Sequence, residues 1–282
     1  MLSTRLGIVG MVGGLAIALA LPQVSGWPLA QNAPARTDHS PLLHNVLLHH
    51  IKDKVEHGDG TADSSNWSGY AVTGTAFNSA EGSWVVPSAT CSGRGDTYAA
   101  FWVGIDGYSS STVEQTGTLI ECVGRRAEYF SWYEFYPSNL IEISSVPVSA
   151  GNTVSASVVY SNGEFTAKIT NVTTGKSFSI SKAVAGAART SAEWIAEAPC
   201  CTVRNGILPL ADFGTAKFGT GSTDVAGTNY ATEGTSASEP IGGFPAANVI
   251  QITKTPSNSS PQTSTCSALA DAGTSFTCTW AN

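Results

Sequence analysis

The histidines of this chain all lie near its start, and this limits the acid–base chemistry open to the rest. All five fall between His39 and His57. A Ser-His-Asp triad, a Cys-His pair and an H-E-x-x-H zinc site each require imidazole. If the first segment is removed, the remaining domain can build none of them. Proton transfer must then depend on carboxylates, tyrosine or lysine, and carboxylates titrate in acid.

Several carboxylates lie beside aromatic residues in strand-like segments, where alternate residues share a face. The pattern occurs in FWVGIDG, with Trp102 and Asp106, and in SWYEFYP, with Glu134, Trp132 and Tyr136. In SAEWIAE, Glu193 and Glu197 share a face opposite Trp194. One sheet face would then form an aromatic-lined cleft with ionisable groups of raised pKa. The alternative is that these are the solvated outer faces of an ordinary sandwich.

The elements that must position these residues are strands. From Asn66 onward, short runs rich in Val, Ile, Thr and aromatic residues alternate with Gly, Ser, Asn and Pro. SNGE (161–164) and TTGK (173–176) are typical of hairpin turns. Helical periodicity is almost absent, so we predict an all-β fold with an antiparallel β-sandwich of two packed, curved sheets; a barrel has similar spacing.

The first residues have the layout of a secretory signal peptide, with Arg5 followed by an apolar run from Leu6 to Leu21 and then small residues. We place it at residues 1–26, although cleavage after Ala30 fits equally well. A membrane anchor is the alternative, but the run is short for a span. The sequence therefore predicts export.

Residues 27–60 differ in composition from the rest of the chain. The stretch HSPLLHNVLLHHIKDKVEHGDG interleaves apolar residues with His, Lys and Asp, which favours a partly helical propeptide; a disordered linker is the alternative. GDGTADSSN (58–66) is typical of a linker. We assign residues 61–282 to a catalytic domain.

Six cysteines lie downstream of the signal segment, and an even number in an exported protein predicts disulfides. Cys266 and Cys278 flank a short turn-rich stretch, and we predict that they pair. We expect the adjacent Cys200 and Cys201 to pair elsewhere rather than with each other. The chain has no C-x-x-C motif, so we expect no metal and no cofactor. Three glycosylation sequons begin at Asn66, Asn171 and Asn258.

The charge balance argues against nucleic-acid binding. Charged residues make up 12% of the chain, only 14 residues are Lys or Arg, and the formal net charge is −7. Such a surface offers little to a phosphate backbone. Few basic residues also limit the positive charge that accumulates in acid, which is compatible with an acidic environment.

Five motifs carry a resemblance to a known family. NWSGY, WVGIDG, QTGT, WYEFYP and AEWIAE occur in the order and approximate spacing of the glutamic peptidases, family G1 or eqolisins, over roughly residues 64–282. The resemblance implies a β-sandwich that cleaves proteins internally at acidic pH without a metal. It implies that Gln115 and Glu193 are the catalytic pair.

The resemblance also implies supporting residues: Trp67, Trp102, Asp106, Glu134 and Tyr136. In this interpretation Trp102 forms part of the cleft floor, and Asp106 orients polar neighbours near Gln115. Two positions depart from the family. Phe135 stands where Trp is frequent, and Glu114 precedes the glutamine where an apolar residue is common.

These expectations combine into a mechanism. Glu193 takes a proton from a water held beside Gln115, the water attacks the scissile carbonyl, and the Gln115 amide stabilises the oxyanion. The histidine-rich propeptide would inhibit the enzyme and leave in acid, because histidine charges near pH 6.5. We expect a monomer acting on protein or peptide substrates. The runner-up is a sandwich that cleaves or binds polysaccharide, with Glu134 and Glu193 about 5–5.5 Å apart if it retains configuration.

Overall fold

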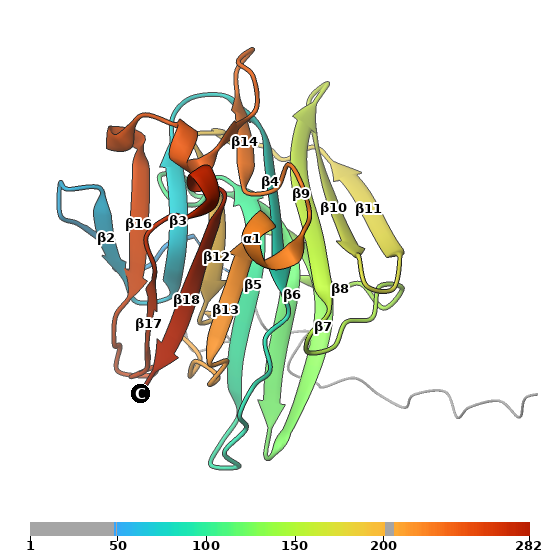
Figure 1. The fold of residues 1–282 in the computed structure, drawn as a ribbon, viewed down its shortest axis with the longest axis vertical. Coiled ribbons are helices and arrows are strands. Elements are labelled where there is room, and N and C mark those ends of the chain that lie inside the picture. The colour runs from blue at the N-terminus through green and yellow to red at the C-terminus, as the bar shows by residue number, and fades with distance from the viewer. Residues whose placement is uncertain (1–47, 49, 201–205) are drawn as a thin grey trace, which may run out of the picture. The chain divides into compact units, whose positions relative to one another are not determined.

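Eighteen strands build the described part of the chain, and most pair with neighbours in an antiparallel sense (Figure 1). The structure is a computed structural model that describes residues 48, 50–200 and 206–282, all within the compact unit Ser40–Asn282. The first nine strands are β1 Val55–Glu56, β2 Thr61–Ser64, β3 Trp67–Thr73, β4 Phe77–Val85, β5 Thr97–Ile105, β6 Val113–Val123, β7 Arg126–Tyr136, β8 Ile141–Glu142 and β9 Thr153–Ser161. The others are β10 Glu164–Asn171, β11 Lys176–Lys182, β12 Ser191–Glu197, β13 Thr215–Gly219, β14 Tyr230–Glu233, β15 Glu239–Pro240, β16 Val249–Lys254, β17 Thr263–Cys266 and β18 Ser275–Ala281.

Helices are few and short in this part of the chain. They are α1 Thr220–Thr223 and the 3-10 turns η2 Ile241–Gly243, η3 Ala246–Asn248 and η4 Asp271–Gly273. Within the described residues, none has the length and apolar character needed to cross a bilayer.

Two layers form the sandwich. One layer runs β16–β3–β12–β5–β6–β7, and the other runs β18–β13–β4–β9–β10–β11. Strand β17 pairs with both β16 and β18 and so connects the layers along one edge. Strands β4 and β9 pack over β5 and β6 without pairing to them. The predicted antiparallel β-sandwich is confirmed, and β2 with β16 is the one parallel pairing among the named strands.

The core between the layers follows the alternation seen in the sequence. Phe101, Val103 and Ile105 point into it, as the apolar stripe of β5 predicts. Two buried tryptophans of this core have hydrogen-bonded indole nitrogens: Trp84 Nε1 donates to Thr118 Oγ1 at 2.9 Å, and Trp194 Nε1 donates to the Glu81 carbonyl at 2.8 Å. A second apolar cluster, containing Trp67, Trp102 and Trp132, lies on the opposite face of the β3–β12–β5–β6–β7 layer.

The predicted SNGE turn and the predicted Cys266–Cys278 disulfide are both confirmed. Asn162 and Gly163 have φ of 52° and 88°, as a tight hairpin between β9 and β10 requires. The Cys266–Cys278 disulfide is present, and Cys91 pairs with Cys122. Cys200 is disulfide-bonded too. The expectation for Cys201 lies outside the described residues.

The segment before β3 differs from its prediction. Residues 1–47, and with them the predicted signal peptide, lie outside the described part. Residues 50–60 contain β1 and no helix, so the helical expectation is wrong there. The predicted linker is wrong as well, because Thr61–Ser64 is a strand. Gly58 and Gly60, with φ of 75° and 80°, turn the chain so that β2 pairs with β1 and β16.

Candidate active site

One row of residues crosses four neighbouring strands and contains the predicted catalytic pair. Glu193 on β12 lies opposite Gly104 on β5, Gly104 lies opposite Gln115 on β6, and Gln115 lies opposite Glu134 on β7. Residues directly opposite in antiparallel strands project from the same face. The structure therefore brings three predicted site residues onto one face of one sheet.

Gly104 leaves a gap in the middle of this row. Glu193 and Gln115 are two strands apart, roughly 10 Å between backbones. A Cβ at position 104 would lie 3.0 Å from Cζ3 of Trp102 and 3.1 Å from Cβ of Gln115. The absent side chain keeps space between the carboxyl and the amide.

The orientation of the Gln115 amide is fixed by Glu134. Gln115 is fully buried, and its Nε2 donates to Oε2 of Glu134 at 2.7 Å. Its Oε1 has no hydrogen-bond partner within the described residues. A primary amide nitrogen carries two hydrogens, so the second remains for another acceptor.

Glu193 has an environment that favours its neutral form. Burial raises the pKa of this carboxyl well above its usual range, and the nearby Asp106 and Glu114 raise it further. The Ser191 hydroxyl and the Tyr108 N–H lie near enough to oppose the shift. Neither carboxyl oxygen makes a hydrogen bond of standard geometry in the described part of the chain. Burial is therefore the largest influence on the pKa of Glu193.

Glu134 is shifted in the same direction. Burial raises its pKa well above the usual range, and Glu197 adds to the shift. The hydrogen bond from Gln115 opposes it, as do the backbone N–H groups of Leu48 and Leu140. The row thus holds two carboxyls whose surroundings disfavour charge.

Aromatic rings form the floor beside the row. The Trp67 and Trp102 rings meet edge to face with centroids 4.9 Å apart. Gly117 pairs with both Trp102 and Trp132, so it separates these two indoles with no side chain of its own. Tyr136, half-buried at the end of β7, makes an edge contact with His50, with the ring centroids 6.2 Å apart.

Asp106 does something other than expected. Its φ of 71° breaks the strand alternation, and its carboxylate accepts backbone N–H groups of residues 188–190. Oδ2 accepts from Ala188 at 2.8 Å and Arg189 at 2.7 Å, and Oδ1 accepts from Thr190 at 3.0 Å. Asp106 therefore fixes the loop that enters β12, the strand that carries Glu193, rather than neighbours of Gln115.

Two further polar residues of this face, Glu197 and Asn66, lie outside the predicted set of site residues. Glu197 is fully buried, and its Oε2 accepts from Trp102 Nε1 at 2.9 Å. Asn66 is also fully buried, and its Nδ2 donates to Oε1 of Glu197 at 3.1 Å. The two-residue period placed Glu197 beside Glu193, whereas Asn66 was marked only by its sequon and as the first residue of NWSGY. A fully buried Asn66 offers no surface for a glycan.

Leu48 and residues 50–54, called the covering segment here, lie over the sheet face that holds the row. Leu48 and Ile51 are buried in the cluster that contains the three tryptophans. Ile51 N–H donates to the Gly107 carbonyl at 3.2 Å. Lys54 Nζ donates to the Tyr108 carbonyl at 3.2 Å and lies 4.0 Å from the centroid of that ring. Gln115, Glu134 and Glu193 are consequently shut off from solvent.

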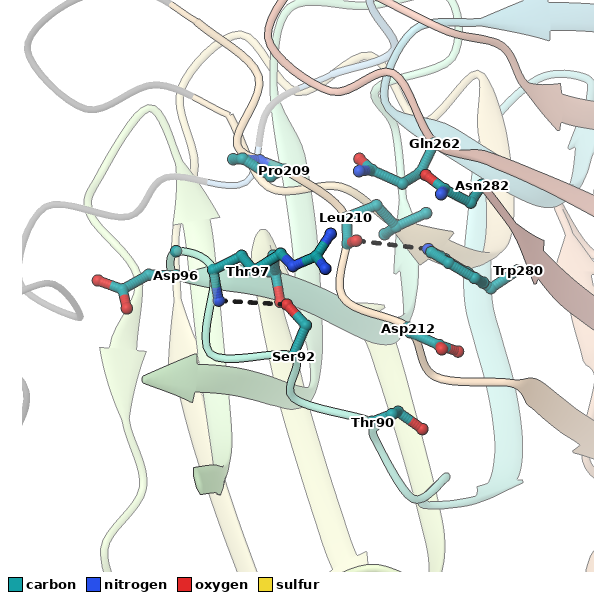
Figure 2. A pocket seen from close by; sticks show the side chains of 12 residues that line it. Thr90, Ser92, Asp96, Thr97, Pro209, Leu210, Asp212, Gln262, Trp280 and Asn282 are labelled. Atoms are coloured by element: carbon teal, nitrogen blue, oxygen red, sulfur yellow. Dashed lines mark hydrogen bonds between the residues drawn. The ribbon is translucent and has the colours of Figure 1, made fainter. Parts of the chain in front are cut away.

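A separate cavity lies elsewhere and contains none of the predicted site residues. It has a volume of about 520 Å³ and lies near the start of β5 and the C-terminal residues (Figure 2). Trp280 donates from Nε1 to the Leu210 carbonyl at 3.4 Å on its wall. The row, rather than this cavity, holds the groups suited to proton transfer.

Comparisons with known proteins point to one family. The model of the Peptidase A4 family matches residues 65–280. Aspergillopepsin-2 of Aspergillus niger is 32% identical over 178 residues, which cover 55% of this chain and 62% of that protein. Scytalidopepsin B of Scytalidium lignicola is 36% identical over 139 residues, which cover 47% of this chain and 51% of that protein. The chain thus spans less than two thirds of either curated relative.

Solved structures agree in fold. Scytalido-glutamic peptidase with a transition state analog inhibitor matches with 27% identity and a TM-score of 0.62, over 77% of this chain and 98% of that one. SCP-B, described as a member of the eqolisin family of peptidases and bound to the tripeptide Ala-Ile-His, matches over the same shares with 27% identity and a TM-score of 0.57.

Proposed function

Because the chain belongs to the Peptidase A4 family, we propose that it is a secreted endopeptidase that hydrolyses peptide bonds of proteins in acid, with Gln115 and Glu193 as its catalytic pair. The observation that carries this is the row in which Gly104 separates these two side chains on one sheet face. The matched structures that hold a transition state analog or a tripeptide support a peptide substrate.

The chemistry follows from the groups in the row. With the cleft open, a water lies in the gap at Gly104, and ionised Glu193 removes its proton as the oxygen attacks the scissile carbonyl. The second hydrogen of Gln115 Nε2 is donated to the developing oxyanion. Glu193 then passes the proton to the leaving amine. An amide donates without titrating, so this oxyanion site survives in acid.

Glu134 acts through Gln115. Its carboxyl accepts one amide hydrogen at 2.7 Å, which turns the other toward the gap. Re-solvation of the cleft on opening lowers the pKa of Glu193 from the raised state caused by burial, because water again stabilises the charged form. The pKa of Glu193 in the open cleft then suits a general base that acts in acid.

The covering segment makes this form a zymogen. Residues 27–60 are the propeptide in this proposal, and of its described residues, Leu48 and residues 50–54 lie across the face that holds the row. It excludes both substrate and water, so the precursor is inactive until the segment leaves. The boundaries at residues 26 and 60 belong to this proposal.

The polysaccharide hypothesis has less support. Gln115 and Gly104 lie between Glu134 and Glu193 in the row, which puts the two backbones roughly 14 Å apart. A retaining pair needs about 5–5.5 Å between carboxyls.

The test is casein digestion at pH 3–4 by acid-treated protein, with pepstatin and EDTA added, beside Glu193→Gln and Gln115→Ala. We expect cleavage by the wild type despite both inhibitors, none by Glu193→Gln, and a loss on the order of 10²–10³ in rate for Gln115→Ala. Near-normal cleavage by a folded Glu193→Gln protein would contradict the assignment of the base.

A further inference from the structure

The side-chain amide of Asn66 pairs with the main chain of the covering segment. Oδ1 accepts the Lys52 N–H at 2.8 Å, and Nδ2 lies 3.5 Å from the His50 carbonyl. In an extended chain, the C=O of one residue and the N–H of the residue two further on point to the same side. A primary amide offers one acceptor and one donor to such a pair.

The opposite edge of the same segment is held as well. The Ile51 N–H, which points the other way, donates to the Gly107 carbonyl at 3.2 Å. On the Asn66 side, the Lys52 carbonyl also accepts from the Ser65 N–H at 3.1 Å. The segment therefore lies in a main-chain clamp, defined here as Asn66, Ser65 and Gly107. These contacts do not depend on which side chains residues 50–52 carry.

The amide of Asn66 is held in one orientation by the catalytic sheet. Its Nδ2 donates to Oε1 of Glu197 at 3.1 Å, and its Oδ1 accepts from Ser64 Oγ at 2.9 Å. A flip of the amide would put the oxygen against the carboxyl. Glu197 also accepts from Trp102 Nε1, so the clamp and the aromatic floor share one anchor.

We propose that Asn66 is a substrate-binding residue that pairs with the main chain of an extended substrate, as it pairs with residues 50 and 52 in the covered form. This rests on the proposed function. A peptidase must hold chains of varied sequence, and main-chain pairing provides binding that no side chain controls. Asn66 therefore strengthens the binding of long substrates and has no part in proton transfer.

The test is a chemical double-mutant cycle on the acid-processed enzyme. A long peptide substrate is made in versions that each replace one amide N–H by an ester oxygen. With the wild type, we expect one position at which the ester lowers kcat/KM about tenfold, as loss of one to two hydrogen bonds does. Asn66→Ala should lower kcat/KM for the all-amide peptide by about the same factor, mostly through KM. The ester at that position should then cost nothing more.

Two further variants keep the test decisive. Asn66→Asp retains the acceptor oxygen, so it should remain sensitive to the ester, and it carries the test if Asn66→Ala does not fold. Asn258→Ala, on an exposed loop residue, is the matched control and should behave as the wild type.

The outcomes separate this inference from the proposed function. Wild-type cleavage with additive effects of the ester and Asn66→Ala, or an unchanged kcat/KM in folded Asn66→Ala, overturns the inference alone. A wild type that is folded and processed but cleaves nothing overturns the proposed function, and the inference with it.

Discussion

Gln115 donates its side-chain Nε2 to Glu134 at 2.7 Å, while Glu193, its proposed catalytic partner, lies beyond Gly104 on the other side. The amide is therefore oriented by a carboxyl that takes no proton from the attacking water. Both carboxyls are buried, and burial raises the pKa of each. Glu134 can serve in its neutral form because it needs only to accept a hydrogen bond.

This arrangement predicts a difference between two substitutions of Glu134. Glu134→Gln keeps an acceptor oxygen and matches the shape of the neutral carboxyl, so we expect kcat in acid to stay within a few fold of the wild type. Glu134→Leu leaves the amide without its partner, which costs about 1–3 kcal/mol, or roughly 5- to 150-fold in kcat. Steady-state kinetics at pH 3–4 on processed protein measure both. Equal losses would show that Glu134 must be ionised.

Gly104 provides a second prediction. In Gly104→Ala the new Cβ would lie 3.0 Å from the Trp102 ring and 3.1 Å from Gln115 Cβ, and so crowd the gap where the water is proposed. We expect at least a tenfold loss of kcat, because small displacements of catalytic groups are costly. Gly206→Ala is the matched control, since its Cβ would meet its nearest atom, Ser259 Oγ, at 3.6 Å. A Gly104→Ala enzyme as active as this control would show that the gap holds nothing essential.

Glu114 predicts how stability varies with pH. This fully buried residue on β6 lies opposite Ile105 and Phe135, and burial, with Asp106 nearby, raises its pKa to about 9. Between the ordinary value of 4.5 and 9, the unfolded chain releases this proton while the folded chain keeps it. The free energy of unfolding must therefore fall as pH rises, by about 1.4 kcal/mol per pH unit for one such group.

Glu114→Gln places a side chain that does not titrate at this position, so the difference in bound protons between the folded and unfolded chain disappears there. Denaturant unfolding of the full chain in a Glu193→Gln background, from pH 5 to 8, should show a slope shallower by about one proton in the Glu114→Gln variant. The background prevents self-digestion during the measurement. An unchanged slope would mean that Glu114 is already ionised in the folded chain.

The sequence predicted the strands well because their signals are local. The alternation in β5 put Phe101, Val103 and Ile105 on the core side, and the same alternation put Glu134 with Trp132 on the other. What it could not give was the register between strands distant in the chain. That Gly104 lies between Glu193 and Gln115 depends on pairings of β12 with β5 and of β5 with β6.

Two errors have physical causes. Asp106 follows the alternation of β5 in sequence, but its positive φ turns the side chain toward residues 188–190. Thr61–Ser64 has the composition of a linker, yet it gains partners on both sides from β1 and β16. Tertiary pairing outweighs local propensity in such short strands.

Release of the covering segment should depend on His50 more than on His57. Burial, with Lys52 nearby, lowers the pKa of His50 below 6.5, so the covered form binds this proton less readily than the open form. The stability that uncharged His50 contributes to the covered form is therefore fully present above pH 6.5. It is lost as pH falls through the lowered pKa of His50. His57 differs, because it is exposed and its Nε2 lies 3.1 Å from an Asp63 carboxylate oxygen. We expect His50→Gln, which stays neutral, to move the midpoint of activation to lower pH.

The measurement incubates the purified precursor from pH 3 to 7 and follows the mature band on gels together with peptide cleavage. His57→Gln is the matched control, and we expect its midpoint not to move to lower pH, because His57 is exposed in the covered form. If His50→Gln activates at the wild-type pH, then protonation of His50 does not drive release. The trigger would then have to be sought in other titrating groups of the segment or of the face that it covers.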